Sequence, residues 1–203
     1  GSSSGSAAAV AVGMVDIGLA SQTAASLTRP ASYCGIVGFK PSYGRYAAAG
    51  IKSLAPSFDT LGTMTRDVAT AALADGVLKG PTAVPSTFKP RRPSSIGICR
   101  TPHWDAAEEA TQKAIEKAGV LFSEEVQVTY IDLEDFAEAA DLHITIMSYE
   151  AAQALGWEYA DRRPLLSSQI VGLLEAGKQI DYATYRAALA RAEELRGRMA
   201  DIF

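Results

Sequence analysis

The strongest constraint on the fold is a strand–helix–strand pattern in the second half of the sequence. Residues 95–100 form a short apolar run typical of a strand, residues 106–118 have the periodicity of a helix, and residues 126–132 predict another strand. Two strands joined through a helix lie parallel in one sheet, because the helix carries the chain back to the edge from which the first strand started. The pattern therefore predicts an α/β fold that contains a parallel pair of strands.

The rest of the chain is also expected to contain helices and strands, with one proline-rich interruption. Residues 80–94 contain four prolines and form the predicted connector between residues 1–79 and residues 95–203. The first part predicts a helix at 6–14, a strand at 16–20, a helical turn opened by Ser26, a strand at 35–40, a loop at 41–62 and a helix at 66–79 capped by Thr65. The last part predicts helices at about 134–160, 165–176 and 182–202.

Composition and charge exclude several classes of protein. With 48% apolar and 21% charged residues, the 203-residue chain has the composition of a soluble globular protein, and no apolar run is long enough to span a membrane. A net charge of −4 gives no electrostatic reason to expect nucleic acid. Two cysteines, Cys34 and Cys99, are too few for a disulfide framework and favour a reducing, cytoplasmic location. We therefore expect neither a membrane nor a nucleic acid as a direct partner.

Two serines are the candidate catalytic residues. Ser26 follows Ser2 by 24 positions, and each lies in a loop of small side chains that leads into a predicted helix. A serine becomes a good nucleophile only when a base removes its proton and backbone amides stabilise the anion that forms. The amides of residues 23–26 are candidates for that second task, because their small side chains let a carbonyl group approach the backbone. From the residues alone, an ordinary helix-capping role for each serine stays open.

The histidines and cysteines indicate no alternative chemistry. His103 follows a proline in an expected loop, and His143 lies within an expected helix, so we interpret each as structural or exposed. Neither histidine has the spacing to the cysteines that a metal site requires. We therefore expect no metal ion and no organic cofactor.

Several sequence runs resemble the amidase signature family. The resemblance rests on the serine-rich turn at the start, on the second serine at the family's spacing, and on the run RPASYCGIVGFKP at residues 29–41. The short run YGR at residues 43–45 and the segment SFDTLGTMTRDVA at residues 57–69 extend it. The resemblance implies the fold of that family, an α/β/α sandwich with a mixed, largely parallel sheet flanked by helices. Residues 1–203 would then be an internal fragment of a single catalytic domain.

The resemblance also implies a reaction and a set of roles. In that family a Ser-cisSer-Lys triad cleaves amides through an acyl-enzyme. By position, Ser26 matches the nucleophile, and Ser2 matches the serine that relays protons from a cis peptide. The backbone amides of Thr23, Ala24, Ala25 and Ser26 match the oxyanion hole. Arg29 sits where some members hold a substrate carboxylate, although a structural salt bridge is an equally good interpretation.

The sequence departs from the family pattern in four places. The catalytic lysine of the family lies on an upstream segment that this chain does not contain, and no residue here replaces it. Ser4 and Ala25 stand where glycines are usual, which matters if the backbone at Ala25 needs a positive φ angle. Gln22 stands where many members have aspartate, and Thr63 replaces a frequent proline.

We therefore expect an amide hydrolase that acts on a small-molecule amide, with the lysine outside this chain and a homodimer left open. One alternative is the glutaminase-type subunit of a tRNA-dependent amidotransferase, although Gln22 argues against that branch. Another is a catalytically incomplete fragment that serves only as a binding or scaffold module.

Overall fold

The computed structural model describes residues 2–80 and 91–202. These residues form two compact units. The first unit takes its residues from 1–88 and 145–185, and the second from 89–144 and 186–203. Most of the predicted connector, residues 81–90, lies outside the described residues. Residues 91–93 have no regular secondary structure.

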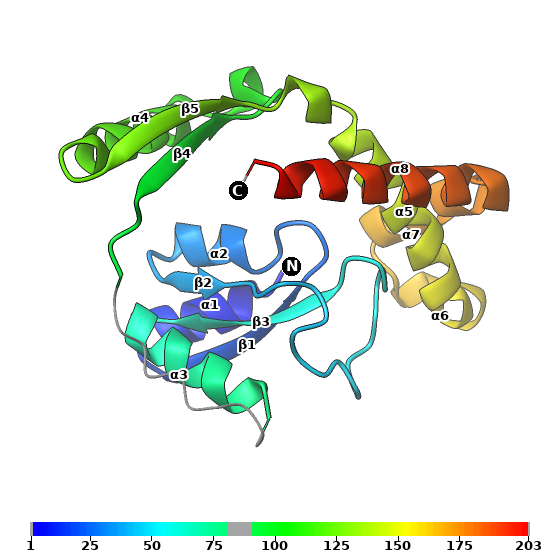
Figure 1. Cartoon of the computed structure of the whole chain (residues 1–203). Helices are drawn as coiled ribbons and strands as arrows, with labels where there is room; N and C mark the ends of the chain where they lie inside the picture. Colours follow the sequence, from blue (N-terminus) through cyan, green and yellow to red (C-terminus); the bar gives the residue numbers. More distant parts are fainter. Residues whose placement is uncertain (1, 81–90, 203) are drawn as a thin grey trace. The chain divides into compact units, whose positions relative to one another are not determined.

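The first unit contains a three-stranded sheet in which the last strand along the chain is central (Figure 1). Strand β3 (Thr60–Thr65) lies between β1 (Ile17–Gln22) and β2 (Val37–Phe39), and it runs antiparallel to both. The register pairs Gln22 at the end of β1 with Thr60 at the start of β3. The end of β1 is therefore held by the strand that follows the long loop.

Strand β3 differs from the prediction, and it changes the expected sheet. The sequence places TLGTMT at the end of a loop and at a helix cap, because this segment lacks both a continuous apolar run and polar–apolar alternation. Five of its six residues are buried, so both faces of this strand are covered. Because β3 is inserted between two strands of the opposite direction, this sheet is antiparallel. In the described residues, parallel pairing occurs only in the second unit.

Helices cover both faces of this sheet, as expected for an α/β/α arrangement. Helices α1 (Ser4–Ala11) and α2 (Thr28–Tyr33) pack on one face, where their apolar side chains meet β1 and β3. Helix α3 (Val68–Leu78) packs on the sheet as well, and Thr63 and Thr65 of β3 are fully buried opposite the face that carries Met64. The buried core residues are Ala7, Val10, Ala20, Leu27, Ala31 and Met64.

The start of α3 differs from the prediction by two residues. Thr65 does not cap the helix; it ends β3, and its hydroxyl donates to the carbonyl of Asp67. Asp67 is the cap, because its carboxylate accepts a hydrogen bond from the Thr70 amide at 2.8 Å. Both residue types cap helices well, and the extension of β3 through Thr65 decides between them.

Residues 145–185 of the first unit are mostly helical. The sequence predicts one long helix at 134–160, but the chain forms α5 (Ala139–Ala154) and then α6 (Gly156–Asp161) after a break at Leu155. The close approach of α7 to α5 depends on Gly177, where an added Cβ would lie 1.9 Å from the carbonyl oxygen of Ser148. The other helical elements are η3 (Arg163–Leu165), α7 (Ser168–Lys178) and α8 (Tyr182–Ala200), and residues 186–200 of α8 belong to the second unit.

The second unit confirms the predicted strand–helix–strand pattern. Strands β4 (Ser95–Arg100) and β5 (Gln127–Asp132) pair in parallel and in register from Ser95 opposite Gln127. Helix α4 (Glu109–Ser123), which follows the short helix η1 (Trp104–Ala106), connects them. It is somewhat longer than the predicted helix at 106–118.

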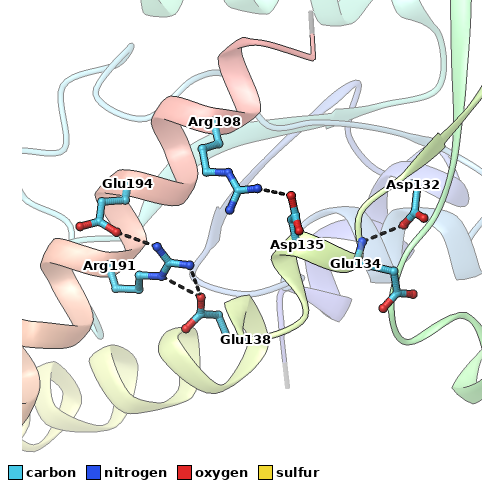
Figure 2. A network of polar contacts seen from close by, with 7 residues as sticks. All are labelled: Asp132, Glu134, Asp135, Glu138, Arg191, Glu194 and Arg198. Carbon is cyan, nitrogen blue, oxygen red and sulfur yellow. Dashed lines mark hydrogen bonds and ion pairs between the residues drawn. The ribbon is translucent and has the colours of Figure 1, made fainter.

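Ion pairs link the C-terminal part of α8 to the segment after β5, within the second unit (Figure 2). Arg191 binds Glu138 at 2.6 Å and Glu194 at 2.7 Å, and Arg198 binds Asp135 on helix η2 (Glu134–Phe136). All these side chains are at least one-third exposed, so each pair contributes at most about 1 kcal/mol. The buried face of α8, which includes Leu195, contributes to holding this helix in place.

The sequence predicts no membrane-spanning run and no disulfide framework. No helix among the described residues is both long and apolar enough to cross a membrane. Cys34 and Cys99 are free thiols.

A substitution at Gly62 tests the contact between the sheet and α2. A Cβ at this position would lie 2.3 Å from the carbonyl oxygen of Phe39 and 2.5 Å from a methyl group of Leu27. We expect Gly62→Ala to lower the free energy of unfolding by about 1–3 kcal/mol, because backbone atoms must move. Gly76→Ala is the matched control, since Gly76 lies on α3 with open space around it, and alanine there should stabilise the helix by up to about 1 kcal/mol. Thermal unfolding of both variants measures this, and equal melting temperatures would contradict the assigned contact.

Candidate active site

Ser26 lies in the turn between the sheet and helix α2. Strand β1 ends at Gln22, residues 23–27 form a bend and a turn, and α2 begins at Thr28. The Ser26 residue is half-buried, and its hydroxyl makes no hydrogen bond with the residues that the structure describes. The Arg29 amide donates to the Ala25 carbonyl at 3.1 Å, so the helical turn already begins at the serine, as predicted.

The side chain of Gln22 organises the turn that follows it. Its amide oxygen accepts hydrogen bonds from the backbone amides of Leu27 at 3.1 Å and Thr28 at 3.0 Å, and from the Thr28 hydroxyl at 3.1 Å. Amides at the start of a helix have no partner within the helix, and this side chain supplies one. Gln22 therefore has a structural role for which an acceptor oxygen suffices, so the replacement of aspartate does not disrupt the turn.

The backbone conformation removes the concern about alanine in place of glycine. Among the described residues, the only non-glycine positions with positive φ are Ser2 and Ser3, at 33° and 56°. Ala25 and Ser4 therefore lie outside the region that favours glycine. A side chain at Ala25 is compatible with this turn without backbone strain.

The strained backbone lies instead in the loop that contains Ser2. Two consecutive residues with positive φ precede α1, a conformation that costs non-glycine residues of order 1–3 kcal/mol each. No cis peptide bond occurs among the described residues, and the bond before Ser2 involves Gly1, which lies outside them. The expected cis peptide at Ser2 therefore stays a prediction.

Arg29 contacts the loop of Ser2. Its guanidinium donates to the Ser2 hydroxyl at 3.4 Å, and both residues are exposed. Arg29 is on the first turn of α2, shortly after Ser26, so this contact brings the two serine-bearing loops to the same side of the molecule. The structure shows no ion pair of Arg29 with a described carboxylate, which leaves its predicted role toward a substrate carboxylate as a prediction.

A buried carboxylate holds the long loop 41–59 against α3. Asp75 accepts hydrogen bonds from Arg45 Nε at 2.9 Å and from the Tyr46 hydroxyl at 2.7 Å, and it forms an ion pair with Lys79 at 2.5 Å. Arg45 holds the pKa of Asp75 well below its usual range, with further help from Lys79 and Tyr46 and against the effect of burial. Burial and the bond to Asp75 raise the pKa of Tyr46, so this phenol stays a donor.

Comparison with known proteins identifies the family. A family model described as Amidase matches residues 1–203. The chain belongs to the amidase family. The structure of this amidase-family chain is also similar to solved structures: a crystal structure of an amidase has a TM-score of 0.87 with 28% identity, over 97% of this chain and 44% of that one. A peptide amidase in complex with the competitive inhibitor chymostatin has a TM-score of 0.74 with 26% identity, over 96% of this chain and 48% of that one.

Curated relatives of this amidase-family chain include one of the subunits of glutamyl-tRNA(Gln) amidotransferase. The protein from Methanocaldococcus jannaschii is 37% identical over 147 residues, which cover 66% of this chain and 34% of that protein. The protein from Staphylococcus epidermidis is 49% identical over 90 residues, which cover 44% of this chain and 19% of that protein. The chain therefore spans about a third or less of the length of these relatives.

Three carboxylates near the site, each buried or partly buried, were not found from the sequence. Asp59, Asp75 and Glu150 each collect hydrogen bonds from other residues, yet none lies in a pattern that distinguishes it from a surface acid. Asp59 and Asp75 lie next to apolar residues, which is a weak signal of burial. The two histidines lie in the second unit.

Substitution of Gln22 tests the role of its amide oxygen. Gln22→Leu leaves the buried Leu27 amide without an acceptor, and we expect it to lower the free energy of unfolding by about 1–3 kcal/mol. Gln22→Glu keeps the acceptor and should be close to the parent. Urea unfolding of the three proteins decides the point, and identical midpoints for the leucine and glutamate variants would show that the oxygen is not needed.

The Asp75 cluster predicts a dependence of stability on pH. Because the pKa of Asp75 is lower in the folded than in the unfolded state, its contribution is complete above the unfolded value of about 3.9 and is lost as the pH falls toward the folded value. We expect Asp75→Asn to cost about 1–3 kcal/mol at neutral pH and to flatten the fall of stability below about pH 4.

The matched control for Asp75 is Asp16→Asn. Asp16 also pairs with an arginine, Arg66, but its side chain is 84% exposed, so we expect a change within about 0.5 kcal/mol. Urea unfolding between pH 2 and pH 7 measures both variants. Parallel pH profiles for the parent and Asp75→Asn would contradict the assigned role.

Proposed function

We propose that the protein is a serine-dependent amide hydrolase in which Ser26 attacks the carbonyl carbon of a small amide. The observation that carries this proposal is the position of Ser26, half-buried at the start of a helical turn, directly after a loop of small side chains. Backbone amides that point out of such a turn stabilise negative charge on an oxygen. Family membership and the similarity to solved amidases support the same reaction class.

Each residue of the site has a chemical task in this mechanism. The Ser26 hydroxyl forms the bond to the carbonyl carbon, and the amides of Thr23, Ala24, Ala25 and Ser26 stabilise the oxyanion of the tetrahedral intermediate. Ser2 passes the Ser26 proton toward the base and then to the departing amine. Water hydrolyses the resulting ester of Ser26 and releases the acid. Arg29, beside Ser2, is placed to bind an anionic group of the substrate.

The base of this mechanism is the lysine that the family pattern places upstream of these residues. In its neutral form it would accept the proton of Ser26 through Ser2, and the proposal assigns it to a segment outside this chain. We further propose that the protein acts in the cytoplasm, which its two free cysteines support.

The glutaminase-type subunit of a tRNA-dependent amidotransferase is the second candidate, because the similar curated proteins are subunits of such an enzyme. The two candidates differ in their dependence on other proteins. A hydrolase releases ammonia or an amine from its substrate alone, whereas the glutaminase-type protein would do so only after its partner subunits are added.

Labelling of the nucleophile tests the proposal. In the full-length protein, we expect a fluorophosphonate probe to modify Ser26, and Ser26→Ala to lower kcat for amide hydrolysis by at least about 1,000-fold, because no other group can form the acyl-enzyme. Ser32→Ala is the matched control, since Ser32 is an exposed serine on α2, the helix that follows the turn of Ser26. Mass spectrometry locates the label. A full-length protein that neither reacts with the probe nor releases an amine would favour the scaffold alternative.

A further inference from the structure

Glu150 is a buried carboxylate for which the proposed mechanism has no task. It lies on α5, in the part of that helix that belongs to the first unit, and only 7% of the residue is exposed. Its Oε2 accepts a hydrogen bond from the Ser57 amide at 2.9 Å, and its Oε1 accepts from the Ser57 hydroxyl at 2.5 Å and the Tyr185 hydroxyl at 2.7 Å. Among the described residues no lysine or arginine forms an ion pair with it. Hydrogen bonds from neutral donors therefore replace the water that the Glu150 carboxylate loses on burial.

The donors of Glu150 are themselves held in place. Tyr185 stacks on Tyr149 with ring centroids 4.1 Å apart and an angle of 13° between the rings. Burial, together with the bond to Glu150, raises the pKa of Tyr185 to about 12, so its hydroxyl keeps its proton at neutral pH. Two bonds from one residue, Ser57, fix that residue of the loop to the helix.

A second carboxylate continues the connection from Ser57 toward the site. Asp59, two residues later, closes the segment 53–59 on itself, because its Oδ2 accepts from the Ser53 hydroxyl at 2.6 Å, the Leu54 amide at 2.7 Å and the Ala55 amide at 3.0 Å. Its Oδ1 accepts a hydrogen bond from the Thr23 hydroxyl. The loop that Glu150 holds is therefore bonded directly to the first residue of the proposed oxyanion hole.

We propose that Glu150 is a positioning residue for the backbone amides that precede Ser26, acting through Ser57, Asp59 and Thr23. This inference rests on the proposed function. The Thr23 hydroxyl is bonded to Asp59, and its neighbour Gln22 pairs with Thr60 at the start of β3. Asp59 and Thr60 therefore hold the start of the loop that contains the oxyanion amides. Because both residues closely follow Ser57, a shift of the chain at Ser57 would also shift that loop.

Loss of the Glu150 contact should weaken stabilisation of the transition state more than it weakens substrate binding. Amides of an oxyanion hole interact most strongly with the anion that forms during the reaction, and a misplacement of about 1 Å can cost about 100-fold in rate. A loosened loop would therefore lower kcat while the affinity for the neutral amide changes little.

Glu150→Gln in the full-length protein tests the inference. The amide nitrogen of glutamine would replace one acceptor oxygen and face a donor of Ser57. We expect kcat per active site to fall about 10- to 100-fold, with KM within about threefold of the parent. Titration with the fluorophosphonate probe counts the active sites, so kcat refers to folded, reactive protein only. Ser57→Ala, which removes one donor and keeps the Ser57 amide, should lower kcat per site by about three- to tenfold.

The matched control is Glu158→Gln. Glu158 lies on α6 and forms an ion pair with Lys52 at 2.7 Å. Lys52 directly precedes Ser53, so Glu158 contacts the same loop but has no bond to Ser57 or Asp59. We expect the Glu158→Gln variant to have the same kcat per active site as the parent. If Glu150→Gln and Ser57→Ala reduce only the number of titratable sites, with unchanged kcat per site, Glu150 merely stabilises the fold and the inference is overturned. If the parent protein itself has no titratable serine, the proposed function fails and the inference falls with it.

Discussion

The candidate site depends on the pairing of β1 with β3. Without it, β1 would be a single strand followed by a loop of small side chains that no side-chain packing could hold. The register from Ile17 opposite Thr65 to Gln22 opposite Thr60 fixes the end of β1 at the point where β3 begins. Because the chain turns immediately after Gln22, this pairing decides where the turn at Ser26 lies.

Helix α2 and the residue before it can approach the sheet closely because the sheet residues Gly38 and Gly62 have no side chains. An added Cβ at Gly38 would lie 2.7 Å from the Cβ of Ala31, and one at Gly62 would overlap with Leu27. Leu27 and Ala31 are almost completely buried there, shortly after Ser26 along the chain. The burial of these apolar side chains supplies the free energy that keeps a strained loop of two positive-φ residues, Ser2 and Ser3, beside the helix.

Polar side chains then hold the loops that packing alone cannot order. Gln22 satisfies the first amides of α2, Asp59 closes the segment 53–59, and Asp75 binds the loop at Arg45. Each of these groups is buried or partly buried, so an unmet donor or acceptor would cost more than at the surface. Such groups order these loops with few residues, in a region that has little regular secondary structure.

The sequence by itself determined the parts that local patterns encode: the parallel pair of residues 95–100 and 127–132, the helical turn at Ser26, the spacing of Ser2 and Ser26, and through these motifs the family. Only the tertiary structure decided that residues 60–65 form the central strand, that Asp67 caps α3 in place of Thr65, and that Asp59, Asp75 and Glu150 accept hydrogen bonds from other segments. The physical reason is the range of the interactions. Helical periodicity and small-residue turns depend on neighbours along the chain, whereas a strand covered on both faces and a carboxylate with distant donors depend on residues brought together by folding.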